Sequence, residues 1–328
     1  MKNSSLYYSV CALLYCPANN EHLVNSIINE KFGNHYSLAL CLEDTIKDEC
    51  VKEAEEKLIH SLEQLHRYLH QKRFYLPKIF IRVRSPKQIL DLIERTQSIA
   101  SIITGFILPK FSLENADSYI ENVLSANQTT NNRFYIMPIL ESPTIINLQN
   151  RYALLYALKE KLDKIEELVL NIRVGGNDLC HMFGFRRHST ESIHNILPVS
   201  SILSDIITVY GMDYVISGPV WEYYNGDNWA NGLIQELNED KLCGFIGKTV
   251  IHPNQIPIVN NAYKVLPQDL EDAKAILNWD TNSHSLVSSS TNKERMNEYK
   301  THYNWAQKII YLAEVYGIIE KNVFASCF

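Results

Sequence analysis

The stretch Phe134-Tyr135-Ile136-Met137-Pro138-Ile139-Leu140 is almost uniformly apolar and is followed directly by Glu141. A strand has this composition when both of its faces are buried, which is typical of parallel sheets. Similar short apolar runs recur along the chain, with helical patterns between them. The strands that we predict are residues 10–16, 36–42, 78–83, 103–108, 133–139, 167–173, 213–217 and 248–251.

This alternation of strands with helical segments, such as residues 51–69 and 154–162, predicts an α/β fold. Eight such units favour a closed (β/α)₈ TIM barrel, which we place at residues 1–265. An open doubly wound sheet is the alternative, but the chain lacks the GxGxxG or Walker loop that would support it.

The pattern changes after the eighth strand, so we assign residues 266–328 to a C-terminal helical lid or oligomerisation segment. Helices are predicted at residues 254–265 and 267–279. Residues 281–293 are rich in Ser, Thr and Asn and predict a flexible hinge. A last helix is predicted from residue 294 to residue 316, ending before Gly317.

Bulk composition excludes several classes of protein. The chain has 328 residues and a net charge of −6, which argues against nucleic acid as a partner. Its seven cysteines are scattered without a CxxC pair, which argues against disulfides and zinc and favours the cytoplasm. The apolar residues 6–16 are interrupted by Tyr7, Tyr8 and Ser9 and do not suit a signal peptide. No run approaches the ~18 apolar residues of a membrane span, so we expect no membrane association.

Polar residues follow most of the predicted strands, and a barrel places its catalytic groups at these carboxyl ends. Any one of them could merely cap a helix or solvate a loop. Together, acids and bases that converge on one face of a barrel favour an active site. They include Glu43, Asp44, Arg82, Arg84, Lys110, Glu141, Asn177, Asp178, Glu222 and His252.

The acids among them, Glu43, Asp44, Glu141 and Asp178, suggest a Mg²⁺ site, because Mg²⁺ prefers carboxylate and water oxygens. Gly175 and Gly176 would let the backbone bend, so that Asn177 and Asp178 reach the mouth of the barrel. The basic pair Arg186-Arg187 could bind a carboxylate or phosphate, or could simply be a solvated loop pair.

The last predicted helix carries two patterns. A packing stripe is predicted at Met296, Tyr299, Tyr303, Ala306, Ile310 and Ala313. Glu298, His302 and Trp305 share a neighbouring face, where they could close over a site. The alternative is a Glu–His pair within the helix, beside a partly buried tryptophan.

Several short motifs, in order, resemble the HpcH/HpaI aldolase and citrate lyase β-subunit family of Mg²⁺-dependent C–C bond lyases, which includes malyl-CoA lyase. Together they cover about residues 12–280. They are Leu42-Glu43-Asp44, Ile81-Arg82-Val83, Leu108-Pro109-Lys110, Leu140-Glu141-Ser142, Gly175-Gly176-Asn177-Asp178 and Gly247-Lys248-Thr249-Val250-Ile251-His252-Pro253.

A closer resemblance is to a bacterial citrate-lyase-like subfamily found with tellurium-resistance and stress-response genes. Its marks here are Tyr15-Cys16-Pro17-Ala18, Gly184-Phe185-Arg186-Arg187, Gly247-Lys248-Thr249, Trp305-Ala306 and Tyr316-Gly317.

The resemblance implies roles for these residues. Glu141 and Asp178 would ligate Mg²⁺, while Glu43 and Asp44 would support its waters and orient Arg82. Arg82 would bind the substrate carbonyl or the developing enolate. Glu298, in Met296-Asn297-Glu298, would be the acid/base, delivered by a neighbouring subunit. The assembly would then be a homo-oligomer, a trimer or a multiple of it.

We therefore expect an enzyme that makes or breaks a C–C bond in a small 2-oxo or hydroxy acid through an enolate. A CoA thioester stays open, because Cys11 or Ala12 stands where many relatives have Arg, and Arg84 where they often have Asn. The alternatives are a phosphoenolpyruvate-type or phosphorylated ligand in the same site, or a non-catalytic stress-response scaffold or sensor. The expected substrate contacts are Lys110, Gly176, Asn177, Arg186, Arg187, His252 and His302.

Overall fold

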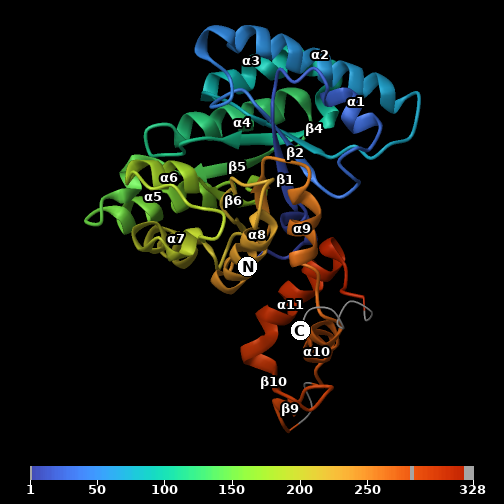
Figure 1. Ribbon diagram of the computed structural model, residues 1–328, viewed down its shortest axis with the longest axis vertical. Helices are drawn as coiled ribbons and strands as arrows, with labels where there is room; N and C mark the ends of the chain where they lie inside the picture. The colour runs from blue at the N-terminus through green and yellow to red at the C-terminus, as the bar shows by residue number, and fades with distance from the viewer. Residues whose placement is uncertain (1, 281–283, 321–328) are drawn as a thin grey trace.

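The computed structural model describes residues 2–280 and 284–320 (Figure 1). Its main sheet has eight parallel strands in the order β7-β6-β5-β4-β3-β2-β1-β8. A parallel bridge between Gly218 and Lys248 joins the two outer strands and closes the barrel. The strands are β1 (Ala12–Pro17), β2 (Ser37–Cys41), β3 (Lys78–Arg82), β4 (Ile103–Leu108), β5 (Tyr135–Leu140), β6 (Ile172–Val174), β7 (Ile216–Ser217) and β8 (Lys248–Val250). The TIM-barrel prediction is confirmed.

Helices surround this sheet (Figure 1). The second, α2, buries Ala54, Leu58, Leu62 and Leu65 at the three- and four-residue spacing of one helical face. The helices are α1 (Leu23–Ile28), α2 (Val51–Leu69), α3 (Pro86–Thr96), α4 (Ala116–Thr130), α5 (Arg151–Asp163), α6 (Gly176–Met182), α7 (Leu197–Tyr210), α8 (Trp229–Cys243), α9 (Gln255–Ala262), α10 (Pro267–Leu277) and α11 (Tyr299–Tyr316). None of the described helices is long and apolar enough to cross a membrane.

The barrel interior is a separate apolar cluster that includes Leu13, Ala39, Phe80, Ile107 and Met137. Side chains two residues further along a strand lie on the same face. The interior faces of β1, β3 and β5 therefore continue toward the carboxyl ends of the strands with Tyr15, Arg82, Ile139 and then Glu141. The apolar cluster fills the lower barrel, and polar groups take over at its mouth.

The strand predicted at residues 167–173 is shorter and later than expected. Glu166–Leu168 form a 3₁₀ turn, and β6 covers only Ile172–Val174. Val169 still makes a bridge to Ile136. The apolar run therefore marks burial correctly, but Glu167 at its start, like Glu166 before it, lies in an exposed turn.

The C-terminal segment differs most from the prediction. In place of a hinge and an early helix start, β9 (Val287–Ser289) pairs antiparallel with β10 (Met296–Glu298). The Ser290 hydroxyl accepts hydrogen bonds from the backbone N–H groups of Glu294 and Arg295, which fixes the turn. Arg295 also binds Asp272 of α10 at 2.7 Å. Residues 281–283 of the predicted hinge lie outside the described residues.

The packing face of α11 also differs from the predicted stripe. Its buried residues are Ala306, Ile309, Leu312 and Tyr316, whereas Met296 is exposed and lies in β10. Because the helix begins at Tyr299, residues 296 and 298 do not follow its periodicity. Gly317 has φ +82° and ends the helix as expected.

Helix α11 packs at the amino-terminal end of the barrel. Tyr311 contacts Tyr8, which precedes β1, with ring centroids 5.3 Å apart. Tyr316 lies 6.0 Å from His35, which precedes β2. In Figure 1, α10, α11 and the β9–β10 hairpin extend from the barrel as a projection. This projection leaves from the end opposite the carboxyl ends of the strands.

Candidate active site

A cluster of charged side chains forms at the carboxyl ends of β2, β3, β4 and β5. One terminal nitrogen of Arg82 lies 2.7 Å from both Glu43 and Asp44 and 3.4 Å from Glu141. Lys110 reaches the same acids, 2.5 Å from Glu43 and 3.3 Å from Asp44. Residues far apart in the sequence are thus brought together because all of them follow parallel strands.

Glu141 is the most buried acid of this cluster, with 3% of its surface exposed. The pKa of Glu141 is raised to about 8. Burial is the main cause of this rise; the charge of Arg82 opposes it and the charge of Asp178 adds to it. One carboxylate oxygen accepts a hydrogen bond from the backbone N–H of Lys110 at 3.0 Å. This Glu141 carboxyl group is held rigidly in an environment that disfavours its charge.

Two backbone features make room for Glu141. Lys110 has φ +49°, in the left-handed region that non-glycine residues rarely adopt, and this turn aims its N–H at the carboxylate. A Cβ atom at Gly175 would lie 2.0 Å from the other carboxylate oxygen, so only glycine fits there. The Gly175-Gly176 motif therefore brings the start of α6 against Glu141.

The acids in contact with Arg82 differ in their proton affinity. Burial raises the pKa of Glu43, although Arg82 opposes the shift. Burial also acts on Asp44, but its hydrogen bond with Glu43 and the charges of Arg82 and Lys110 together lower its pKa. Burial opposes the charge of Arg82, yet Tyr15, Glu141 and Glu43 raise its pKa overall, which keeps the guanidinium charged.

The donor set at the mouth fits Mg²⁺. Asp178 lies in the first turn of α6 and is near enough to Glu141 for the two negative charges to repel. A divalent cation would remove this repulsion, and carboxylate oxygens are the ligands that Mg²⁺ prefers. Within residues 2–280 and 284–320, no group of three or more His, Cys, Asp or Glu could hold a metal. Glu141 and Asp178 would therefore leave most ligand positions to water and substrate.

A cavity of about 210 Å³ opens beside Glu141 and Arg82. Pockets for drug-sized ligands are about 300–1,000 Å³, so this one suits a small acid. Gly176 and Asn177, both predicted contacts, line it. Its walls come from Tyr15, Thr45, Arg82, Ile139, Glu141, Arg173, Val174, Gly175, Gly176, Asn177, Val220, Thr249 and Ile251.

The sequence analysis missed Arg173, which lies inside the barrel on β6 and lines this cavity. Its neighbours in sequence are apolar, so it could have been noticed as a lone charge within a predicted strand.

Other predicted contacts lie away from the cavity. Arg186 is exposed, and its nearest acid is Glu222 at 3.8 Å. The ring of His252 stacks on that of Tyr224 with centroids 4.7 Å apart. Neither residue lines the 210 Å³ cavity.

Arg187 is buried in an ionic network behind the barrel wall. Its guanidinium forms an ion pair with Glu236 of α8 and also donates to the backbone oxygen of Val220. Lys248 of β8 completes the network, 2.9 Å from Glu236 and 2.6 Å from Asp240. Since Lys248 of β8 and Arg187 are both paired there, we do not assign Arg187 to the substrate.

The C-terminal residues Glu298 and His302 do not meet the site within one chain. The backbone N–H of Glu298 donates to His302 Nδ1 at 3.0 Å. Both residues belong to the projection that starts from the opposite end of the barrel. The structure therefore supports the local pairing of Glu298 with His302 and separates both from Glu141.

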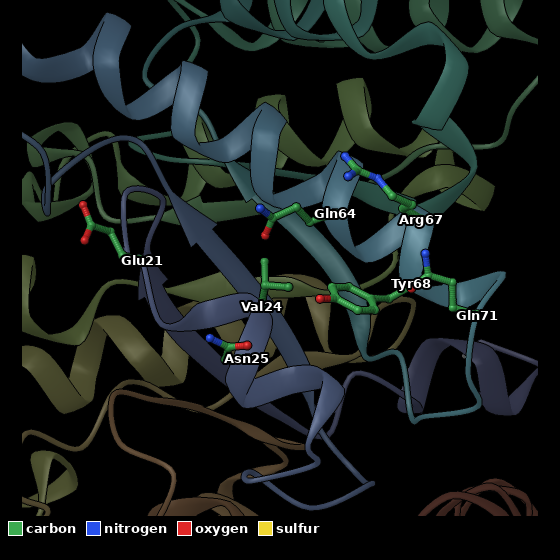
Figure 2. Close-up of a pocket in the computed structure, with 7 residues that line it drawn as sticks. All are labelled: Glu21, Val24, Asn25, Gln64, Arg67, Tyr68 and Gln71. Atoms are coloured by element: carbon green, nitrogen blue, oxygen red, sulfur yellow. The ribbon is translucent and has the colours of Figure 1, made fainter.

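A second pocket, of about 360 Å³, lies on the surface between α1 and α2 (Figure 2). Figure 2 shows Val24 and Asn25 of α1 facing Gln64 and Tyr68 of α2. Three amides, one carboxylate and one guanidinium contribute to its lining, together with Val24 and Tyr68. This surface pocket is larger than the barrel cavity. It has one acid, Glu21, in its lining, whereas several acids converge beside the barrel cavity.

Solved structures with similar folds include citrate lyase proteins. A citrate lyase from Burkholderia xenovorans has a TM-score of 0.69 and 13% identity, covering 97% of this chain and 96% of its own. The protein CitE from Mycobacterium tuberculosis, in complex with magnesium, acetoacetate and coenzyme A, has a TM-score of 0.60 and 18% identity, covering 94% and 99%. These likenesses show the fold. No curated protein matches the chain.

The family model described as the C–C bond lyases of the TIM-barrel fold matches residues 4–318, nearly the whole chain. This match agrees with the closed barrel and with the charged cluster at its mouth. The chain belongs to the C–C bond lyase family and is a carbon–carbon lyase of the TIM-barrel fold.

Proposed function

We propose that this lyase cleaves or forms a C–C bond in a small 2-oxo or hydroxy acid in the presence of Mg²⁺. The observation that carries the proposal is the contact between Arg82 and Glu141 at a 210 Å³ cavity. A magnesium ion also accompanies oxaloacetate in a citrate lyase β-subunit from Mycobacterium tuberculosis, which covers 79% of this chain at 17% identity and a TM-score of 0.52.

Glu141 and Asp178 would hold the ion. When bound, Mg²⁺ would supply Lewis-acid polarisation of a substrate oxygen, which is worth several kcal/mol. The remaining steps fall to the chain. Arg82 faces the same cavity and would stabilise the negative charge that develops on the enolate oxygen. Glu43 and Asp44 hold the Arg82 guanidinium in place, and Lys110 binds both of these acids.

In the cleavage direction, the substrate hydroxyl loses its proton to a base and becomes a carbonyl as the electron pair of the C–C bond passes into the enolate. A proton then returns to the enolate carbon and restores the second carbonyl compound. We assign this proton to Glu298 of a neighbouring subunit, with His302 bound to its backbone. The assignment requires a homo-oligomer, which we propose to be a trimer or a multiple of it. A CoA thioester would extend out of the cavity, which by its volume holds only the acid portion.

The proposal is tested by calorimetric titration of the protein with Mg²⁺ and then with oxaloacetate, pyruvate or acetyl-CoA. We expect Mg²⁺-dependent binding of a keto acid that Glu141→Gln abolishes, while Glu167→Gln, at an exposed surface pair with Arg133, changes nothing. Acetyl-CoA that raises keto-acid affinity would assign a CoA substrate. An unchanged Mg²⁺ affinity in Glu141→Gln would refute the metal site.

The phosphorylated-ligand alternative rests on the Arg186-Arg187 pair and on Lys110. Since Arg187 is paired with Glu236 and Arg186 is solvated, no contact of this pair favours it. The link to tellurium resistance and the cytoplasmic location stay predictions from the sequence.

A further inference from the structure

Arg173 is a buried cation that has no anionic partner among residues 2–280 and 284–320. It is 2% exposed, and its Nε and Nη1 atoms have no hydrogen-bond partner. Nη2 donates to the neutral Thr249 hydroxyl at 2.5 Å, and the neutral phenol of Tyr15 is the other hydrogen-bonding neighbour of the guanidinium. Within the described residues, no carboxylate oxygen lies within 4.0 Å of this guanidinium, and the groups that favour its charge are the hydroxyls of Tyr15 and Tyr316.

The other buried arginines are compensated. Arg82 contacts Glu43, Asp44 and Glu141, Arg151 contacts Asp205 at 2.7 Å, and Arg187 contacts Glu236. An unpaired buried charge is costly, because the protein interior solvates it far less well than water does. A fold that keeps Arg173 in this position needs an anion from elsewhere.

The position of Arg173 indicates where this anion comes from. Arg173 pairs in register with Ile139 of β5, and Ile139 stands two residues before Glu141. Arg173 and Glu141 line the same cavity. Tyr15 lies between the two arginines, with the Arg82 guanidinium 5.8 Å from its ring centre. The cavity thus has Glu141 and Arg82 at its mouth and Arg173 on the wall toward the barrel interior.

We propose that Arg173, with Thr249 and Tyr15 beside it, forms an anion subsite for a second carboxylate of the substrate. The substrate would then be a dicarboxylic acid: its 2-oxo or 2-hydroxy acid end lies at Glu141 and Arg82, and its distal carboxylate points into the barrel. This inference rests on the proposed function and names the class of acid that the site takes.

A carboxylate suits the subsite better than a phosphate. The planar guanidinium matches a planar carboxylate, and one cation balances its single charge. A phosphate dianion would need further positive charge, but the remaining walls near Arg173 are Ile139, Val174 and Thr249. The volume of about 210 Å³ also limits the acid to a small one.

The test compares three acids in calorimetric titrations of the full chain with Mg²⁺: oxaloacetate, phosphonopyruvate and pyruvate, which lacks a second anionic group. We expect the wild type to prefer oxaloacetate. Arg173→Met should weaken oxaloacetate about 10- to 100-fold, the range of a hydrogen bond to a charged group, and leave pyruvate and Mg²⁺ unchanged. Arg173→Lys, which keeps a point charge, should regain part of the loss.

Thermal unfolding without ligand gives an independent readout. Since Arg173 lacks an anionic partner, Arg173→Met should keep or raise the Tm, whereas Arg151→Met, which removes an equally buried but paired arginine, should lower it. A Tm that falls equally in both would make Arg173 a structural residue and overturn the proposal.

The other titration outcomes distinguish a failure of the subsite proposal from a failure of the lyase proposal. Equal losses for oxaloacetate and pyruvate in Arg173→Met would refute the subsite and leave the lyase proposal standing. An Arg173-dependent preference for phosphonopyruvate would refute the carboxylate assignment. Absence of Mg²⁺-dependent binding of any of the three acids would refute both proposals.

Discussion

At the barrel mouth, burial of a single carboxyl group, that of Glu141, disfavours its ionised form. Glu141 is nearly dry, faces Asp178 and has a pKa raised to about 8 by burial. Arg82 offsets part of this cost at 3.4 Å. The carboxyl group is therefore protonated at neutral pH in the absence of a cation, and a bound metal would have to displace this proton.

This gives a pH dependence of metal binding. Mg²⁺ binds the ionised carboxylate, and the raised pKa of Glu141 means that the protonated form dominates below about pH 8. The Mg²⁺ affinity should therefore rise ~10-fold per pH unit from about pH 6 to 8 and level off above. Calorimetry across this range checks it, with proton release measured in buffers of different ionisation enthalpy. A flat profile would contradict the raised pKa.

Among the elements, α8 and β8 are joined by charge rather than by apolar contact alone. Lys248 is fully buried between Glu236 and Asp240, and Arg187 and His194 complete the network. Burial would raise the pKa of Glu236, but Lys248 and Arg187 lower it. The network holds β8 in place next to the bridge that closes the barrel.

Removing Lys248 should therefore destabilise the fold. Lys248→Met leaves two buried carboxylates with fewer partners, and breaking a buried ion pair costs about 3–5 kcal/mol. Urea unfolding would measure this loss. The matched control is Lys57→Met, because Lys57 pairs with Glu53 and Glu21 at the surface, where ion pairs contribute little. Equal stability of the two variants would show that the network is dispensable.

For the whole molecule, the position of the C-terminal projection matters most. α11 packs against residues that precede β1 and β2, whereas the charged cluster follows the strands. Glu298 lies in β10, at the end of the projection, and the barrel separates it from Glu141 in its own chain. One chain alone thus presents the proposed acid/base and the proposed metal ligands at opposite ends of the barrel.

Complementation between subunits tests this arrangement. Glu141→Gln and Glu298→Gln should each be inactive alone. Co-expressed or mixed after partial unfolding, they should recover part of the activity, because some sites would combine an intact Glu141 with an intact Glu298. Light scattering would establish that hybrid oligomers form. Hybrids without activity would exclude Glu298 as a residue delivered by the neighbouring subunit.

The barrel and much of its mouth can be predicted from the amino-acid sequence. Apolar runs such as residues 134–140 mark strands buried on both faces, and parallel strands bring their carboxyl ends together whatever the loops do. Glu43, Arg82 and Glu141 could therefore be placed in one cluster before their contacts were known.

The other features of the site depend on contacts between residues that are distant in the sequence. A uniformly apolar strand does not reveal which face lines the barrel axis, so the inward position of Arg173 and the outward position of Lys248 could not be read from their neighbours. Arg187 was uncertain because its partner Glu236 lies 49 residues away. The β9–β10 hairpin depends on the contact of Arg295 with Asp272, a tertiary interaction that local propensity does not encode.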